Sequence, residues 1–215
     1  MTLIDISPVL SPSTAVFPGD VSFERTVVMD VERGDHLTLS SVRSTVHIGA
    51  HVDAPNHYAR GGRGIDEQPL DLYVGPAEVI HIPAAGRRLG PEDISGEISA
   101  ARVLFRTDSF PDPNHWNDDF ASLSPELVHW LSERGVKLVG IDTPSVDPST
   151  SKGLESHAAI AERDMAILEG IVLGHVEPGL YRLYALPLRI QGADASPVRA
   201  VLEQDGSPGR APRIG

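Results

Sequence analysis

The chain has 215 residues, of which 40% are hydrophobic and 22% are charged, and its formal net charge at pH 7 is −12. This length and composition suit a single globular domain with a substantial core. No apolar run approaches the roughly 20 residues that cross a bilayer, and the acidic balance argues against nucleic acid or an anionic membrane as a partner. The chain has no cysteine, which excludes disulfides and thiolate metal ligands and fits a reducing cytosol. Because its start shows no signal-peptide pattern, we expect a cytoplasmic protein.

Strand-like runs recur along the chain and are separated by turns rich in glycine and proline. They cover residues 38–47, 77–82, 102–106, 137–141, 167–173 and 180–188. Strands outnumber helices, so the sequence predicts a strand-rich, mixed α/β fold. We expect one domain over residues 1–203. A flexible tail is expected over residues 204–215, where glycine and proline are frequent and large apolar side chains are few.

Two helices are expected among these strands. The first is indicated over residues 126–134, because Ser124 is placed as its N-cap and Gly135 as its stop. A proline in the first helical position strengthens this prediction. The second helix is expected to cover residues 158–164 and to begin one or two residues earlier.

The segment most informative about chemistry contains three histidines and one aspartate at alternate or every fourth position. They are His47, His51, Asp53 and His57. Imidazole nitrogen and carboxylate oxygen are the usual ligands of zinc and other borderline divalent metals, and burying such groups together without a cation would be costly. A fully extended chain would separate His47 from Asp53 by roughly 20 Å. The segment therefore has to bend, and Gly49 and Pro55 are placed where a bend costs little.

The residue pattern by itself leaves the chemistry open. Two histidines and a carboxylate suit a catalytic zinc that keeps a position for water, but they also form the facial triad of mononuclear non-heme iron oxygenases. A third alternative is a non-catalytic module in which the metal only stabilises the fold. His157 and Glu169 are further candidates, although in one continuous helix they would lie about 18 Å apart. They can join one site only if a short helix turns back into the strand near Ile167.

The pattern H-x-G-A-H-x-D-x-P-x-H that begins at His47 resembles the signature of the metal-dependent cyclase/formamidase superfamily, and within it the bacterial kynurenine formamidases (arylformamidases). The likeness extends along almost the whole chain, through residues 5–8, 17–20, 138–145, 165–173, 185–188 and 194–200. Two departures leave the expected ligands intact. Phe17 stands where the family commonly has tryptophan, and Ala50 stands where many superfamily members have threonine.

The resemblance implies a swivelling β/β/α fold, a homodimer and a site for two divalent ions, usually zinc, with manganese as the alternative. The residues that match the family's metal ligands are His47, His51 and Asp53 for the first ion, Asp53 and Glu169 as carboxylates that bridge both ions, and His157 for the second ion. His57 matches the family's general acid/base. Phe17 matches the aromatic residue that lies against the substrate.

The activity that the resemblance implies is hydrolysis of the amide N-formyl-L-kynurenine to L-kynurenine and formate, a step of tryptophan degradation. The expected partner is therefore a small-molecule substrate. Hydrolysis of another cyclic or aryl amide or lactone by the same kind of site is the nearest alternative within the superfamily. The residue pattern leaves the iron oxygenase as the alternative from another class of enzyme.

Overall fold

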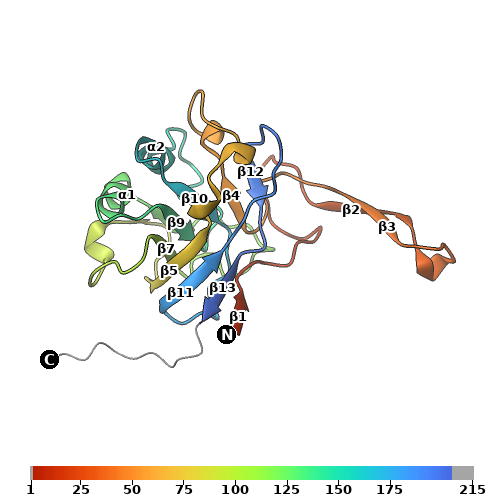
Figure 1. Ribbon diagram of the computed structural model, residues 1–215, viewed down its shortest axis with the longest axis horizontal. Helices are drawn as coiled ribbons and strands as arrows, with labels where there is room; N and C mark the ends of the chain where they lie inside the picture. Colours follow the sequence, from red (N-terminus) through yellow and green to blue (C-terminus); the bar gives the residue numbers. More distant parts are fainter. Residues whose placement is uncertain (1, 205–215) are drawn as a thin grey trace.

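Nine strands form one sheet in the computed structural model, which describes residues 2–204 (Figure 1). Their order across the sheet is β1 (Thr2–Asp5), β13 (Val201–Gln204), β11 (Gly179–Tyr184), β5 (Val74–His81), β7 (Arg102–Arg106), β9 (Leu138–Ile141), β10 (Ala166–Glu169), β4 (His51–Asp53) and β12 (Ala195–Pro197). The four strands from β5 to β10 in this order are parallel, and the strands on both sides of them pair antiparallel. Parallel strands end at the same edge of a sheet, so the loops after β9 and β10 meet there.

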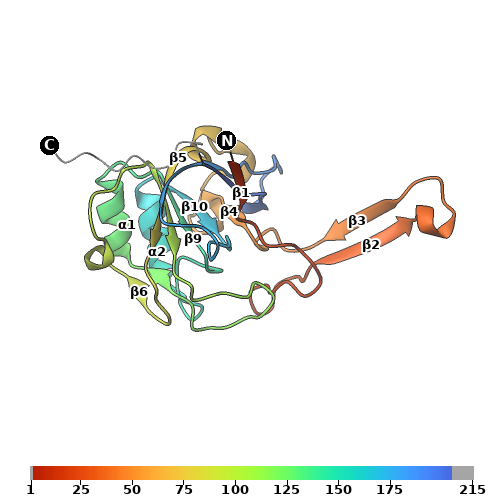
Figure 2. The ribbon, with the colours of Figure 1, turned by 90° about the horizontal axis from the view of Figure 1, so that it is seen from below.

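The sheet separates two hydrophobic cores. Residues in β7, β9 and β10 are almost all buried, as expected of parallel strands that are covered on both faces. Successive side chains point to opposite faces, so Val103 and Phe105 join one core while Leu104 joins the other. The helices α1 (Pro125–Ser132) and α2 (Glu155–Glu162) lie together over the first of these faces (Figures 1 and 2).

The two helices lie close to their predicted positions. Ser124 Oγ accepts a hydrogen bond from the Leu127 backbone N–H, as an N-cap does. The helix α1 ends at Ser132, two residues before the predicted end, and Gly135 then adopts a left-handed φ of +82° that lets the chain turn toward β9. The helix α2 covers Glu155–Glu162, so it begins and ends slightly earlier than predicted.

The strand predicted over residues 38–47 is the clearest correction. Only Leu39–Arg43 (β3) is a strand, and it pairs with β2 (Glu24–Met29) in a two-stranded hairpin that projects from the body (Figure 2). We call residues 24–43 the arm. Side-chain alternation correctly indicates extended chain here, but every residue of β3 is exposed, so burial does not select its partner. Residues 44–50 form bends and lead into β4.

The later strands are shorter than predicted. β10 ends at Glu169 because Gly170 adopts a φ of +65° and turns the chain, and β11 ends at Tyr184. β7 coincides with its predicted span, and a short parallel pair, β6 (Arg88–Leu89) and β8 (Ser122–Leu123), completes the strands. The strand-rich, mixed α/β fold is confirmed.

The end of the described chain bears on the expected tail. Gln204, the first residue of that tail, is the last residue of β13, and residues 205–215 lie outside the described residues. Within residues 2–204, no helix combines the length and apolarity needed to cross a membrane.

Candidate metal centre and active site

The strand β4 presents two of the predicted ligands. His51 and Asp53 are two residues apart, so their side chains point to the same side of the sheet. The antiparallel register places Glu169, the last residue of β10, directly opposite His51. His51 Nε2 lies 3.2 Å from Glu169 Oε2 and 3.6 Å from Asp53 Oδ1. All three side chains are almost fully buried, so the sheet brings together groups from two distant stretches of sequence.

His47 reaches the same carboxylates from the bent segment ahead of β4. Gly49 has a φ of +55°, a left-handed conformation that glycine adopts at little cost, and His47 Nδ1 lies 3.0 Å from Asp53 Oδ1. The end of β10 packs tightly on this bend, because a Cβ atom at Gly170 would overlap the carbonyl oxygen of Gly49. The bend that the sequence requires is therefore present, and two glycines make it possible.

His157 joins this group from the first turn of α2. We call the five side chains of His47, His51, Asp53, His157 and Glu169 the cluster. The helix is short and the chain returns as β10, which meets the condition set by the sequence. His157 Nε2 lies 3.5 Å from Asp53 Oδ2 and 3.7 Å from Glu169 Oε1. The buried Asp147 carboxylate fixes this orientation, because it accepts hydrogen bonds from Nδ1 (2.8 Å) and from the backbone N–H of His157 (3.1 Å). Asp147 therefore holds the start of α2 and the imidazole together.

In His47, His51 and His157, one ring nitrogen donates a hydrogen bond to a protein oxygen and the other ring nitrogen faces carboxylates of the cluster. His51 Nδ1 donates to the Gly49 carbonyl oxygen (2.9 Å), and His47 Nε2 donates to Asp194 Oδ2 (2.9 Å). His157 Nδ1 donates to the buried carboxylate of Asp147 in the same way. This arrangement fixes the ring orientations and turns the other three ring nitrogens toward two buried carboxylates, where they could bind a metal ion once deprotonated.

The donor set fits a metal site. Both carboxylate oxygens of Asp53 are buried, and among residues 2–204 neither accepts a hydrogen bond, although His47 Nδ1 lies 3.0 Å from Oδ1. A buried carboxylate without a hydrogen-bond donor is unfavourable unless positive charge lies beside it. Two groups of donor atoms have all their members within 4.8 Å of one another: His47, Asp53 and His57, and His51, Asp53 and Glu169. Asp53 belongs to both groups.

The electrostatics of the metal-free cluster agree with this interpretation. Burial opposes the charged form of His47, but the neighbouring Asp53 outweighs burial and raises the pKa of His47 to about 9. Burial is outweighed in the same way at His157, where Asp147 and Asp53 raise the pKa to about 10. Burial alone would raise the pKa of Asp53, but His157 and His47 hold it well below its ordinary value. A metal ion would replace the protons on these rings.

His57 stands slightly apart from the buried groups. It ends the short 3-10 helix Pro55–His57, and its ring centroid is 4.2 Å from that of His47. Its side chain is 33% exposed, which is more than the imidazoles of the other predicted site histidines. Burial lowers the pKa of His57 below its ordinary value, so the ring is neutral at pH 7 and can accept a proton.

Asp194 is a candidate site residue that the residue pattern does not identify. Its Oδ2 lies 2.9 Å from His47 Nε2 and 3.7 Å from His57 Nδ1, so it connects the two rings. It precedes β12, which pairs with the strand that bears His51. Its only sequence signal is its place in a stretch, residues 194–200, that contributes to the family resemblance.

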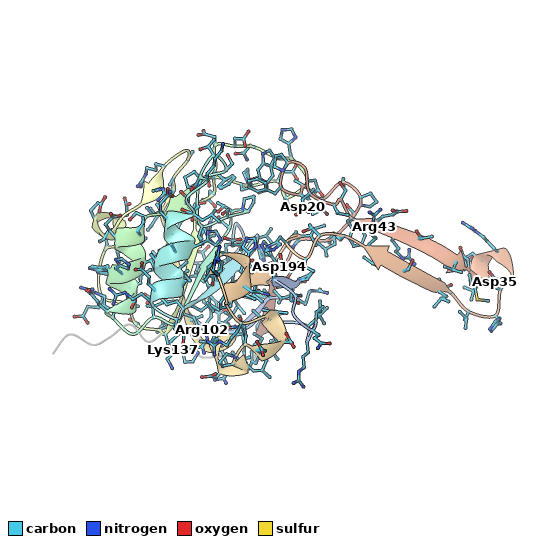
Figure 3. The ribbon with its side chains drawn as sticks, turned by 90° about the horizontal axis from the view of Figure 1, so that it is seen from above. Asp20, Asp35, Arg43, Arg102, Lys137 and Asp194 are labelled. Carbon is cyan, nitrogen blue, oxygen red and sulfur yellow. The ribbon has the colours of Figure 1, made fainter. Side chains whose placement is uncertain are left out.

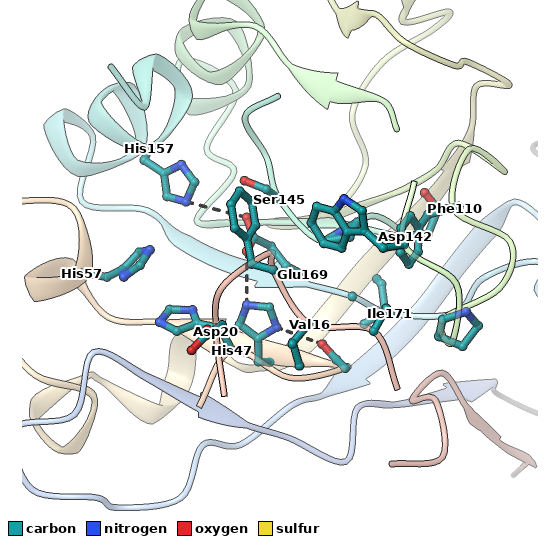
Figure 4. Close-up of a pocket in the computed structure, with 18 of the residues that line it drawn as sticks. Val16, Asp20, His47, His57, Phe110, Asp142, Ser145, His157, Glu169 and Ile171 are labelled. Atoms are coloured by element: carbon teal, nitrogen blue, oxygen red, sulfur yellow. Dashed lines mark hydrogen bonds and ion pairs between the residues drawn. The ribbon is translucent and has the colours of Figure 1, made fainter. Parts of the chain in front are cut away.

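The cluster lines one part of a cavity of about 350 Å³. Figure 4 shows His57, His157 and Glu169 around one side and Phe110, Asp142 and Ile171 on the other. The apolar part of the wall includes Val16, Phe17, Phe110, Pro113, Trp116, Pro144, Leu154, Ile171 and Val172. The rings of Phe17 and Trp116 meet edge to face at 5.1 Å. Phe17 was expected from the sequence, whereas Phe110 and Trp116, from the loop after β7, were not.

Comparison with known proteins identifies the family to which the chain belongs. The family described as putative cyclase has a model that matches residues 4–148, and the chain belongs to this family. A solved structure described as a potential metal-dependent hydrolase with cyclase activity has a TM-score of 0.81 and 26% sequence identity to this chain, and the match covers 94% of this chain and 96% of that one. This relationship to a metal-dependent hydrolase agrees with the donor set.

Relatives with higher sequence identity to this chain are kynurenine formamidases. The kynurenine formamidase of Bordetella avium (strain 197N) is 44% identical over 206 residues, which are 95% of this chain and 99% of that protein. The kynurenine formamidase of Salinibacter ruber (strain DSM 13855 / M31) is 46% identical over 213 residues, 97% of this chain and 100% of that protein. The resemblance seen in the sequence is confirmed over nearly the full length of the chain.

Proposed function

We propose that this protein is a metal-dependent amide hydrolase that converts N-formyl-L-kynurenine to L-kynurenine and formate, in tryptophan degradation. The observation that carries this proposal is the buried Asp53 carboxylate, which has no hydrogen-bond donor in residues 2–204 and faces nitrogens from three histidines. The kinship with the two kynurenine formamidases supports the choice of substrate.

The proposed cofactor is a pair of divalent ions, zinc or, as the alternative, manganese. The residues that would hold them are His47, His51 and Asp53 for one ion, Asp53 and Glu169 between both ions, and His157 for the other. The membership of Asp53 in two overlapping donor groups supports this sharing. When bound, such ions supply a water of lowered pKa and polarise the carbonyl group that is attacked.

His57 is proposed to move the proton in the reaction. Hydrolysis forms a bond between the water oxygen and the formyl carbon and breaks the bond from that carbon to the aryl nitrogen. Neutral His57 accepts the water proton and delivers it to the departing nitrogen, so that the arylamine leaves uncharged. Asp194 positions the ring through its contact with Nδ1. An arylamine is a better leaving group than an alkylamine, and the aromatic wall at Phe17 suits its ring.

The experiment that tests the function is the release of formate from N-formyl-L-kynurenine by purified protein, with and without a chelator. We expect turnover that the chelator abolishes and that added zinc or manganese restores. The variant His57→Ala is expected to keep its metal and to lose about 10²- to 10⁴-fold in kcat. The matched control is His115→Ala, which removes an exposed imidazole outside both the arm and the cavity wall. If His57→Ala loses metal and activity together, His57 is a ligand and the proposed proton transfer is wrong.

The alternatives predict different results. A mononuclear oxygenase would contain one iron ion and would consume oxygen in turnover. A site that only stabilises the fold would leave His57→Ala without effect on any reaction. Opening of a cyclic amide or lactone without release of formate would indicate a related hydrolase of the same superfamily.

We also propose that the protein acts as a homodimer. The arm supports this, because it carries large apolar side chains in solvent: Val28, Val31, Leu37, Leu39 and Val42 are each at least 40% exposed. Burying such side chains against a second copy would be favourable. Light scattering of the purified protein tests the proposal, and a mass of one chain at micromolar concentration would refute it. The cytoplasmic location stays a prediction.

A further inference from the structure

The charged residues of the cavity wall outside the cluster are few. They are Asp20, Asp142 and Lys152. Asp142 is buried and already engaged, because its Oδ2 accepts hydrogen bonds from the backbone N–H groups of Thr107 (2.8 Å) and Asp108 (3.0 Å). Two charged groups of opposite sign, Asp20 and Lys152, are therefore left to meet a ligand.

Among residues 2–204, Lys152 is the only lysine or arginine in the cavity wall. Its ammonium group has no carboxylate within ion-pair distance in the part of the chain that the structure describes. The loop that presents it is well held, because Ser151 Oγ accepts a hydrogen bond from the Leu154 backbone N–H (3.0 Å) and donates one to Glu155 (2.9 Å). A lysine on a fixed loop without a protein partner is suited to bind an anion that enters the cavity.

Asp20 lines the same cavity. It closes a turn in which its backbone N–H donates to the Phe17 carbonyl oxygen (2.9 Å). One of its carboxylate oxygens accepts a hydrogen bond from the Val21 backbone N–H (2.8 Å), which holds the side chain in place. Within residues 2–204 it forms no ion pair. The second oxygen is therefore available to a cationic group of a ligand.

We propose that Lys152 binds the α-carboxylate of the substrate and that Asp20 binds its α-ammonium group. This inference rests on the proposed function and names the residues that select an amino acid among aryl formamides. A carboxylate is a stronger ligand for divalent ions than a formyl oxygen. Without a cation at the wall, the carboxylate end would compete with the formyl end for the metal cluster. Lys152 directs the carboxylate away from the cluster, and the formyl group then reaches His57.

Three substrates separate the two contacts. N-formyl-L-kynurenine carries both charges, and its decarboxylated analogue N-formylkynuramine keeps only the ammonium group. The third, 2-formamidoacetophenone, keeps the ring, the ketone and the formamide but has neither charge. The variants are Lys152→Met and Asp20→Asn. The control is Lys137→Met, which removes the other lysine of the chain. Figure 3 shows Lys137 far from Asp20, which lies at the base of the arm.

Lys152→Met is expected to raise KM about 10-fold for N-formyl-L-kynurenine alone, the usual loss for one hydrogen bond to a charged group. Asp20→Asn is expected to raise KM by a similar factor for both substrates that have the ammonium group. The kcat for 2-formamidoacetophenone should stay within about two-fold of the wild type in all variants, since neither residue acts on the formyl group. Lys137→Met should resemble the wild type throughout.

A direct binding measurement distinguishes failure of this inference from failure of the proposed function. Calorimetric binding of L-kynurenine to the metal-loaded protein should weaken about 10-fold in Lys152→Met. If the wild type hydrolyses the formamides but Lys152→Met changes KM equally for all three, or for none, the carboxylate contact is wrong. If the wild type releases no formate yet binds L-kynurenine through Lys152, the function fails and the contact survives. If it neither turns over nor binds, both are wrong.

Discussion

The variant Gly170→Ala tests the close packing that joins β10 to the histidine loop. Gly170 has a φ of +65°, which costs a residue with a Cβ atom roughly 1–2 kcal/mol. The new Cβ would also approach the Gly49 carbonyl oxygen to well under 3.0 Å, and real Cβ atoms avoid such a distance. The backbone has to move, and overpacking of this kind costs about 1–3 kcal/mol. Together the two effects predict a loss of about 2–5 kcal/mol in the free energy of unfolding.

The assay is thermal unfolding in the presence of a chelator, so that metal binding does not contribute to the melting temperature. A loss of this size in a chain of 215 residues lowers Tm by at least about 4 °C. The matched control is Gly135→Ala, because Gly135 has a φ of +82° and no atom within 4 Å of the added Cβ. Gly135→Ala should lose only the free energy of unfolding that comes from the left-handed φ. Equal Tm values for the two variants would refute the claim that contact with the histidine loop matters.

Three further predictions concern the cluster. Glu169→Gln should weaken metal binding at least about 10-fold, and elemental analysis showing unchanged metal content would contradict the proposed shared carboxylate. Asp147→Asn should weaken metal binding about 10- to 100-fold and lower Tm as well, since the same carboxylate holds the start of α2; an effect on neither would show that His157 needs no support. In the metal-free protein, His47 and His157 have pKa values raised to about 9 and about 10, above the ordinary value of about 6.5. The stability that these shifts contribute is fully present below pH 6.5 and is lost as pH rises through 9 and 10, so chelated protein should melt at a lower temperature at pH 9.5 than at pH 6.5, and a Tm that rises would be inconsistent with the ion pairs described.

Local rules predicted much of the fold because they act within a few residues. Ser124 caps the start of α1, and Gly135 turns the chain three residues after its end, because such signals depend only on the adjacent backbone. The same rules gave little guidance about pairing. The segment at Leu39–Arg43 is extended as expected, but its partner is the neighbouring β2, and nothing in a fully exposed strand specifies whether it joins the main sheet or an arm.

The candidate site also contains residues with a local sequence signal and residues that only the fold brings together. Three histidines and an aspartate within eleven residues predict a metal site by their density alone. His157 and Glu169 needed the family resemblance, because their approach to Asp53 depends on α2 ending early enough for the chain to return as β10. Asp194 and Asp147 were missed since an isolated aspartate has no local signal, and each acts only through an imidazole that the fold brings to it.

The buried carboxylates of the cluster have a consequence for the life of the protein in a cell. A metal ion that binds Asp53 and Glu169 only in the folded state stabilises that state, so a metal-depleted molecule opens more often than a loaded one. Proteases degrade chains that open. Scarcity of the metal would therefore reduce the number of folded molecules as well as the activity of each one, and total activity would fall with metal supply more steeply than simple loss of a cofactor predicts.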